Sequence, residues 1–189
     1  MNEPFLEPIL RNMRISKVLP TIKEYKSCQM LDIGCGWEAK LLKSVEKYIS
    51  SGIGIDFKAP YFNNEKITTL QVKLEKKLPF ENESFDVVTM LAVLEHLDNP
   101  SEIISEIKRV LRVNGKLIIT VPSIYSKPVL EFLSYKLKIV NEDEIRDHKK
   151  YYNKYLLYEL FNKAGLEIET HKYFQCYMNN FCVIQKYNI

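Results

Sequence analysis

Two acidic residues and two glycines near the start of the chain have the types and the spacing of a cofactor-binding site. Asp32 lies inside a short apolar run that is followed by Gly34, Cys35 and Gly36. Glycine permits positive φ angles and lets a ligand come close to the backbone. A helix that follows such a loop directs its free N–H groups at that ligand. Asp56 then lies about 20 residues further along, where an acid can meet a ribose of the same ligand.

Two classes of cofactor use this geometry. The run from Gly34 to Ala39 satisfies the GxGxx(G/A) fingerprint of dinucleotide-binding proteins, with Asp56 in the place of its ribose-binding acid. Taken alone, this fingerprint is weak evidence for NAD. The rest of the chain has to decide between a dinucleotide and another nucleoside cofactor.

The composition is that of a globular protein. Apolar residues make up 46% and charged residues 27% of the 189 residues, which excludes an intrinsically disordered chain. The net charge is only +3, because acidic residues nearly match the lysines and arginines. Nucleic-acid-binding proteins usually concentrate basic residues on one face, so no nucleic-acid partner is expected.

The cysteines and the N-terminus indicate a cytoplasmic protein. No pair among Cys28, Cys35, Cys176 and Cys182 has CxxC spacing, so neither a metal site nor a redox pair is expected. No signal peptide is expected from the first residues, and no apolar run approaches the ~20 residues of a membrane span. Reduced thiols in the cytoplasm follow as the expectation. The oligomeric state is not predicted.

Hydrophobic periodicity predicts strands that alternate with helices. Strands are predicted at 29–33, 52–57, 67–72, 85–90, 116–121, 166–173 and 176–187. Helices are predicted at 5–26 (one or two, interrupted at Pro20), at 38–48, from Asn99 to Asn114-Gly115, and from Asn153 to Gly165. The whole chain, 1–189, is therefore predicted to be one α/β domain with an N-terminal helical segment over 1–27. We expect a Rossmann-like, doubly wound, seven-stranded and mostly parallel sheet, with an antiparallel C-terminal strand and helices on both faces.

Further segments separate the two cofactor classes. They are Asp32 itself, Leu78 to Val88, Leu94-Glu95-His96-Leu97 with Pro100, and Arg109 to Leu117. Together with the glycine loop, and in this order, they closely resemble the class I S-adenosylmethionine-dependent methyltransferases of the type 11 group. The resemblance covers residues 28–123 well and 146–168 more loosely. It implies methyl transfer from S-adenosylmethionine, with S-adenosylhomocysteine as product, and leaves NAD as the lesser alternative.

The resemblance also implies roles for ten residues around the cofactor. Asp32, Gly34, Cys35 and Gly36 would line its methionine part. Asp56 would bind both ribose hydroxyls, and Phe57 would cover one face of the adenine. Leu74 and Glu75 would present their backbone to the adenine edge, and Leu91 and Ala92 would lie beside the sulfonium and the methionine amino group.

The chain departs from the family at two places. Glu38 stands where a third glycine is usual, and Lys73 stands where an aspartate often accepts the adenine amino proton. Because lysine cannot accept a hydrogen bond, adenine recognition would rest on backbone groups. These departures keep a second interpretation open, in which the protein binds S-adenosylmethionine without catalysing methyl transfer.

Methyl transfer is an in-line displacement with a neutral leaving group, so the enzyme mainly aligns the reactants. A base is needed only for a weak nucleophile such as a hydroxyl. His148 and His96 are the candidate catalytic residues, and Tyr125 and Tyr152 are expected to line the substrate. A purely structural role for His148 stays open.

Residues 122–152 are longer than a simple loop and include an apolar pattern from Pro128 to Lys138 that predicts a helix. We expect this segment to form a cap over the substrate, since such loops give these folds their specificity. A short cap favours a small-molecule acceptor. By analogy with the family, a sugar or glycan intermediate is the expected type of acceptor.

Overall fold

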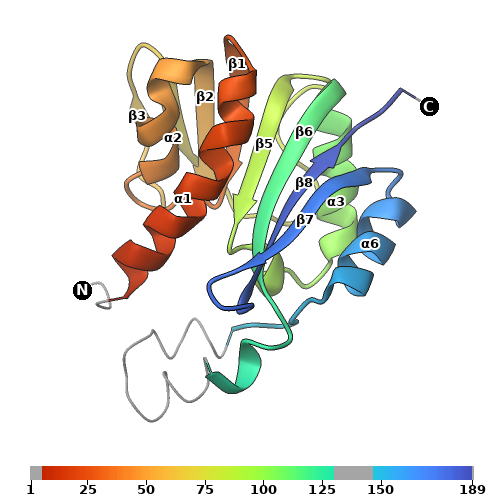
Figure 1. Cartoon of the computed structure of the whole chain (residues 1–189). Helices are drawn as coiled ribbons and strands as arrows, with labels where there is room; N and C mark the ends of the chain where they lie inside the picture. The colour runs from red at the N-terminus through yellow and green to blue at the C-terminus, as the bar shows by residue number, and fades with distance from the viewer. Residues whose placement is uncertain (1–5, 130–146, 189) are drawn as a thin grey trace.

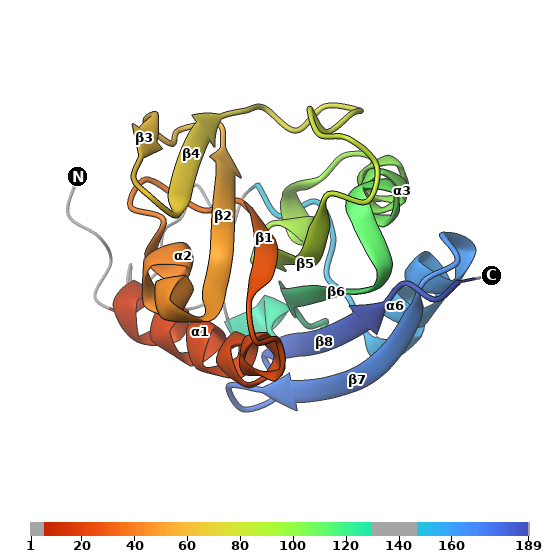
Figure 2. The same ribbon diagram turned by 90° about the horizontal axis from the view of Figure 1, so that it is seen from above.

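The structure, a computed structural model, describes residues 6–129 and 147–188. At its centre lies an eight-stranded sheet with the order β3-β4-β2-β1-β5-β6-β8-β7 (Figure 2). The strands are β1 (Cys28–Ile33), β2 (Ile49–Asp56), β3 (Phe62–Asn63), β4 (Ile67–Gln71), β5 (Phe85–Leu91), β6 (Leu111–Pro122), β7 (Glu167–Phe174) and β8 (Asn179–Gln185). The helices are α1 (Glu7–Glu24), α2 (Lys40–Val45), α3 (Pro100–Val110) and α6 (Lys154–Lys163), with short 3₁₀ turns η1 (Glu46–Tyr48) and η2 (Leu94–His96).

The predicted architecture is confirmed. The neighbouring strands β4, β2, β1, β5 and β6 are all parallel, and β8 inserts antiparallel between β6 and β7. The one difference is an eighth strand, because the two-residue β3 pairs antiparallel with β4. So short a strand carries no readable periodicity, and the sequence analysis missed it.

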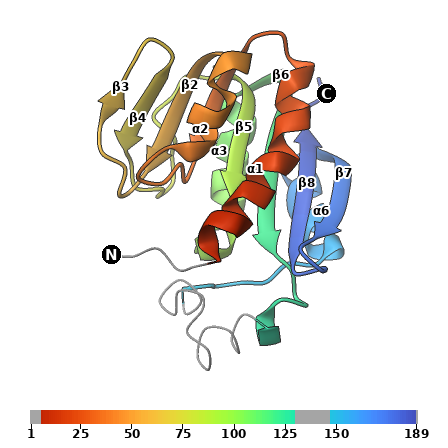
Figure 3. The ribbon, with the colours of Figure 1, turned by 60° about the vertical axis from the view of Figure 1, so that its left-hand side comes forward.

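Helices cover both faces of the sheet (Figures 1 and 3). The helices α1 and α2 lie on one face, and α3 and α6 lie on the other. The strands feed both cores by alternation: Ile118 packs on the side of α1, whereas Leu117 and Ile119 pack on the side of α3. This two-sided burial explains why the central strands read as continuous apolar runs.

The helix boundaries differ from the prediction at three points. The first helix runs unbroken from Glu7 through Pro20 to Glu24, so one helix forms here and not two. The helix at 38–48 begins only at Lys40 and ends in η1. The helix after Asn99 ends at Val110, not at Asn114-Gly115. Asn114 does adopt a positive φ of 64°, but within an irregularity of β6, where its register with β5 shifts.

The last helix is as predicted. The side chain of Asn153 accepts a hydrogen bond from the N–H of Leu156 at 2.9 Å, which caps α6. Gly165 follows the helix with a φ of +69°, the left-handed conformation of a helix C-terminus. Most of the expected cap segment, including all of the helix predicted over 128–138 except residues 128 and 129, lies outside the described residues, and those two residues are helical. Within 6–129 and 147–188, no helix is long and apolar enough to cross a membrane.

Candidate functional site

The glycine loop lies at the point where the strand order of the sheet reverses. From β1 the chain adds β2 and β4 on one side, then returns to add β5 and β6 on the other. Ligands of such sheets bind at the carboxyl ends of the strands beside this point. The loop from Gly34 follows β1 directly, and its N–H groups at Gly34 and Cys35 both donate to the carbonyl of Ile55 in β2, at 2.8 and 3.2 Å.

The two glycines are required for different reasons. Both have positive φ, 77° at Gly34 and 68° at Gly36. A Cβ on Gly34 would overlap the Cγ2 atom of Val93, so this glycine lets the loop pack against the segment after β5. A Cβ on Gly36 would meet no described atom within 4 Å. The space beside Gly36 is therefore open to a ligand that approaches the backbone.

Asp56 ends β2 and reaches back to the glycine loop. Its Oδ2 accepts a hydrogen bond from the N–H of Gly36 at 3.2 Å, and its Oδ1 accepts one from the N–H of Lys58 at 2.8 Å. A carboxylate has about four acceptor positions, so each oxygen keeps capacity for a ligand hydroxyl. Phe57 follows Asp56, and 60% of its surface is exposed. Its ring is therefore accessible to a flat ligand that stacks on it.

Asp32 is a buried acid, only 3% exposed. Its Oδ1 accepts a hydrogen bond of 2.7 Å from the hydroxyl of Thr89 in β5. Burial raises the pKa of Asp32 to about 7, the Thr89 hydrogen bond opposes this rise, and the charge of Asp56 adds to it. A cationic group placed here would favour the ionised form, whereas an anionic group would be repelled.

Cys35 is a buried packing residue of the glycine loop. Its side chain is 8% exposed, and its sulfur occupies the space above Gly54, where an added Cβ would lie 2.8 Å from Sγ. Burial, with the charges of Asp32 and Asp56, raises the pKa of the Cys35 thiol to about 12. A thiol of this kind is not a nucleophile at neutral pH.

The remaining residues expected at the cofactor lie at the same edge of the sheet or beside it. Leu74 is half-buried and packs on the core, whereas Glu75 is exposed and pairs with Lys73 at 3.6 Å. Leu91 ends β5, and Ala92 follows with a φ of 56° while its N–H donates to the carbonyl of Thr120 at 2.9 Å. Glu38 also points outward and pairs with Lys40 at 2.7 Å.

The structure brings the two candidate catalytic histidines together. The ring centroids of His96, in η2, and His148, before α6, lie 5.0 Å apart. The N–H of Lys149 donates to the carbonyl of Glu95 at 2.8 Å and so joins the two segments. Nδ1 of His96 lies 2.9 Å from Oδ2 of Asp147. Burial, with the neighbouring His96, lowers the pKa of His148 to about 4, although the charge of Asp147 opposes this.

The two tyrosines expected to line the substrate differ. Tyr125 is 56% exposed and meets the ring of Tyr173 edge-on at 6.0 Å, so it is available to a ligand. Tyr152 corrects the prediction: it is only 1% exposed and belongs to the hydrophobic core between the sheet and α6. Its backbone pairs with Pro122 and Ile124, which turns the side chain into the protein.

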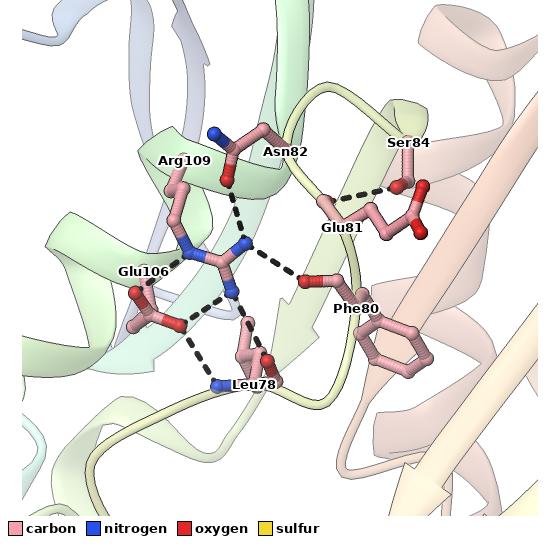
Figure 4. Close-up of polar contacts among 7 residues, drawn as sticks. All are labelled: Leu78, Phe80, Glu81, Asn82, Ser84, Glu106 and Arg109. Atoms are coloured by element: carbon pink, nitrogen blue, oxygen red, sulfur yellow. Dashed lines mark hydrogen bonds and ion pairs between the residues drawn. The ribbon is translucent and has the colours of Figure 1, made fainter.

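Two of the segments that carry the resemblance, Leu78 to Val88 and Arg109 to Leu117, are held together by a hydrogen-bond network that stabilises the fold. Figure 4 shows the guanidinium of Arg109 among acceptors from α3 and from the loop before β5. It donates to both carboxylate oxygens of Glu106, to the carbonyls of Leu78 and Phe80, and to Oδ1 of Asn82, all between 2.7 and 3.0 Å. Glu106 also accepts the N–H of Leu78 at 2.9 Å. This network fixes the loop that leads into β5.

Three residues beside the site were not predicted as part of it. Thr89 binds Asp32, Asp147 binds His96, and Glu95 is a carboxylate only 1% exposed beside the two histidines. Thr89 had a signal, because it is a polar residue within the apolar run from Val87 to Leu91. The contacts that bring Asp147 and Glu95 to the site join distant parts of the sequence, because Asp147 meets His96 and Glu95 lies beside His148, each about 50 positions away.

The family comparison agrees with this geometry. Residues 31–119, which run from β1 through β6, match the type 11 methyltransferase domain. This segment is a methyltransferase domain. It contains the glycine loop, Asp56, the end of β5 and the network around Arg109.

Relatives of the methyltransferase domain extend the likeness to most of the chain. The ubiquinone biosynthesis O-methyltransferase of Rickettsia bellii is 23% identical over 188 residues, which cover 88% of this chain and 73% of that protein. An uncharacterised protein of Methanocaldococcus jannaschii is 26% identical over 160 residues, which cover 74% of this chain and 61% of that protein. For two further relatives the chain spans 46% and 32% of their length. The chain therefore spans less than two thirds of several curated relatives it matches.

Solved structures agree on the fold. The S-adenosylmethionine-dependent methyltransferase of Mesorhizobium loti superimposes with a TM-score of 0.67 at 15% identity, over 90% of this chain and 98% of that one. At this identity the likeness shows the fold of the methyltransferase domain and nothing more specific.

Proposed function

We propose that the protein is an enzyme that transfers a methyl group from S-adenosylmethionine to a small molecule. The observation that carries the proposal is the pair of carboxylates around the glycine loop, one buried at Asp32 and one with free acceptor capacity at Asp56. S-adenosylmethionine has an ammonium and a sulfonium cation and no phosphate, so it suits a site with two acids. The pyrophosphate of NAD would bring negative charge to the same place.

The residues of the site fit this cofactor. The open space beside Gly36 admits the amino-acid part, and Asp32 provides the charge that favours a cation nearby. Asp56 can accept hydrogen bonds from two ribose hydroxyls, a fork that fixes orientation as well as affinity. Phe57 offers an exposed ring to the adenine, and Leu91 and Ala92 would bound the reacting end.

The chemistry asked of the protein is modest. S-adenosylmethionine would supply an electrophilic methyl group, and the neutral thioether S-adenosylhomocysteine would remain as the product. The side chains mainly have to hold the acceptor in line with the methyl carbon and the sulfur, and to keep water out. We place His96 and His148 on the acceptor side, where their nitrogens can act as a base or as metal ligands.

The acceptor is proposed as a small molecule. Three relatives are named as ubiquinone biosynthesis, demethylmenaquinone and sterol methyltransferases, and quinones and sterols are ring compounds with a lipid-like character. The exposed rings of Tyr125 and Tyr177, together with Tyr173 between them, offer an aromatic surface that suits such a ring. A sugar or glycan acceptor, the cap role of 122–152 and a cytoplasmic location stay predictions.

Separate titrations with two candidate ligands, S-adenosylhomocysteine and NAD, test the proposed cofactor. Calorimetric titration should show binding of S-adenosylhomocysteine to the wild type and no binding of NAD. Asp56→Ala should weaken S-adenosylhomocysteine at least tenfold, because it removes the ribose acceptors, while the exposed-acid control Glu102→Ala should not. Binding of NAD in preference to S-adenosylhomocysteine would refute the proposal.

A further inference from the structure

Three side chains beyond the carboxyl end of β5 have the types and the placement of metal ligands. Glu95 and His96 lie in η2, and His148 lies before α6. One ligand atom from each lies within 4.8 Å of the other two. The hydrogen bond from Lys149 to the carbonyl of Glu95 holds the two segments together, so the cluster does not depend on the side chains alone.

The distances among the three ligand atoms are close to those found around a bound metal ion. Zinc–nitrogen and zinc–oxygen distances are about 2.0–2.2 Å, so ligand atoms around one ion lie roughly 3–4 Å apart. Both imidazoles are half-buried, and small rotations about their side-chain bonds would close the remaining difference. Two imidazoles with one carboxylate suit zinc, manganese or iron(II), and leave further coordination positions open.

The surroundings of the histidines follow the pattern of metal-binding imidazoles. Nδ1 of His96 lies 2.9 Å from Oδ2 of Asp147, and Nδ1 of His148 lies 3.2 Å from the hydroxyl of Tyr151. When Nδ1–H donates to a carboxylate, the lone pair remains on Nε2, and the ring is held in orientation. The third group, Glu95, is only 1% exposed, and a cation favours a carboxylate at such a depth.

We propose that Glu95, His96 and His148 bind a divalent transition-metal ion next to the methyl-transfer site. Its role rests on the proposed function, whereas its existence does not. A hydroxyl of the acceptor bound to the ion would lose its proton to solvent water more readily. The oxygen would then form the bond to the methyl carbon, while the electron pair of the carbon–sulfur bond stays on sulfur. No metal site was predicted, because cysteine spacing gives no sign of one and these three ligands are not cysteines.

Calorimetry of the full chain with Zn²⁺ or Mn²⁺ alone, after dialysis against EDTA, tests the site. We expect one ion per chain in the wild type. Glu95→Gln and His148→Ala should each weaken binding at least tenfold. The matched control is His171→Ala, because His171 lies on β7, where its Nε2 is bonded to Asn180 at 2.9 Å, and outside the cluster. Its affinity for the ion should equal that of the wild type.

Absence of binding of both ions to the wild type would overturn the proposal, and so would equal binding in wild type, Glu95→Gln and His148→Ala. Should a ligand variant fail to fold, Asp147→Ala replaces it, since loss of the His96 partner should still weaken the ion about tenfold. A parallel titration with S-adenosylhomocysteine in EDTA separates the two proposals. A wild type that binds S-adenosylhomocysteine but neither ion contradicts the metal site. A wild type that binds an ion but no S-adenosylhomocysteine contradicts the cofactor assignment.

Discussion

Asp32 and Thr89 are register partners on the adjacent parallel strands β1 and β5, and a hydrogen bond of 2.7 Å joins their side chains in the protein interior. This bond orients a carboxylate that burial makes hard to ionise. The arrangement disfavours the charged form until a cation arrives, so it couples the stability of the free protein to pH.

The free energy of unfolding of the ligand-free protein should fall as pH rises from about 4 to about 7. The pKa of Asp32 rises from 3.8 to about 7 on folding, so the folded state holds the proton more tightly than the unfolded state. That stabilisation is complete below the unfolded pKa and is lost as pH rises through the folded pKa. The full difference corresponds to about 4 kcal/mol, an upper bound.

Urea unfolding at several pH values measures this dependence. In Asp32→Asn the fall should disappear, so that the variant exceeds the wild type in stability at pH 8 by about 2–4 kcal/mol. The same variant should bind S-adenosylhomocysteine more weakly. Parallel pH profiles for wild type and variant would show that Asp32 does not titrate in this range.

Alanine substitutions at the two glycines should have different effects, one on folding and the other on cofactor binding. Gly34→Ala should prevent stable folding, because its Cβ would overlap Val93 in addition to the positive φ. Gly36→Ala should fold with a loss of about 1–2 kcal/mol from backbone strain alone. Its methyl group would stand in the space proposed for the cofactor, so S-adenosylhomocysteine should bind at least tenfold more weakly.

Thermal melts and calorimetry on the two variants check this pair. Val93→Ala should partly restore folding of Gly34→Ala, because it removes the overlapping Cγ2 atom. Unchanged S-adenosylhomocysteine affinity in a folded Gly36→Ala protein would mean that the cofactor does not occupy the space beside this glycine.

Much of this fold could be predicted from the sequence because its signals are local. Asn153 caps α6 and Gly165 ends it, as their residue types indicate. Asn114 shows what such local signals cannot decide. Asparagine tolerates the left-handed conformation that Asn114 adopts, but the sequence does not reveal whether such a residue ends a helix or bends a strand. The pairing of β6 with β5, a non-local contact, decides for the strand.

The cofactor side of the site was predictable for the same reason, and the acceptor side was not. Gly34, Gly36 and Asp56 lie at or beside the ends of strands whose order the pattern fixes. By contrast, Tyr152 was expected at the substrate and is buried, because the pairing of its backbone with Pro122 and Ile124 directs its ring inward. Only three-dimensional contacts disclose such a direction.

Arg109→Leu should destabilise the protein by about 2–3 kcal/mol, because it leaves Glu106 and two loop carbonyls without their charged donor. Arg109→Lys should recover only part of the loss, since an ammonium cannot reproduce the planar fork. Denaturant unfolding measures both, and the exposed Glu102→Gln on the same helix should stay within about 0.5 kcal/mol of wild type. Equal stability of Arg109→Leu and wild type would show that the network of Figure 4 does not stabilise the protein.

Tyr152→Phe should leave stability unchanged or raise it by up to about 1 kcal/mol. The phenol oxygen is buried and has no hydrogen-bond partner among the described residues, so its removal abolishes a desolvation cost. Tyr125→Phe, at an exposed position, serves as the neutral comparison. A loss of more than about 1 kcal/mol in Tyr152→Phe alone would indicate that the hydroxyl has a partner in solution.

The most direct measurement is a crystal structure of the protein grown with S-adenosylhomocysteine. The account predicts density for the amino-acid part in the space beside Gly36, the ribose hydroxyls within hydrogen-bond distance of Asp56, and the adenine against Phe57. Density at another place on the molecule, or an empty site at a saturating concentration of S-adenosylhomocysteine, would contradict it.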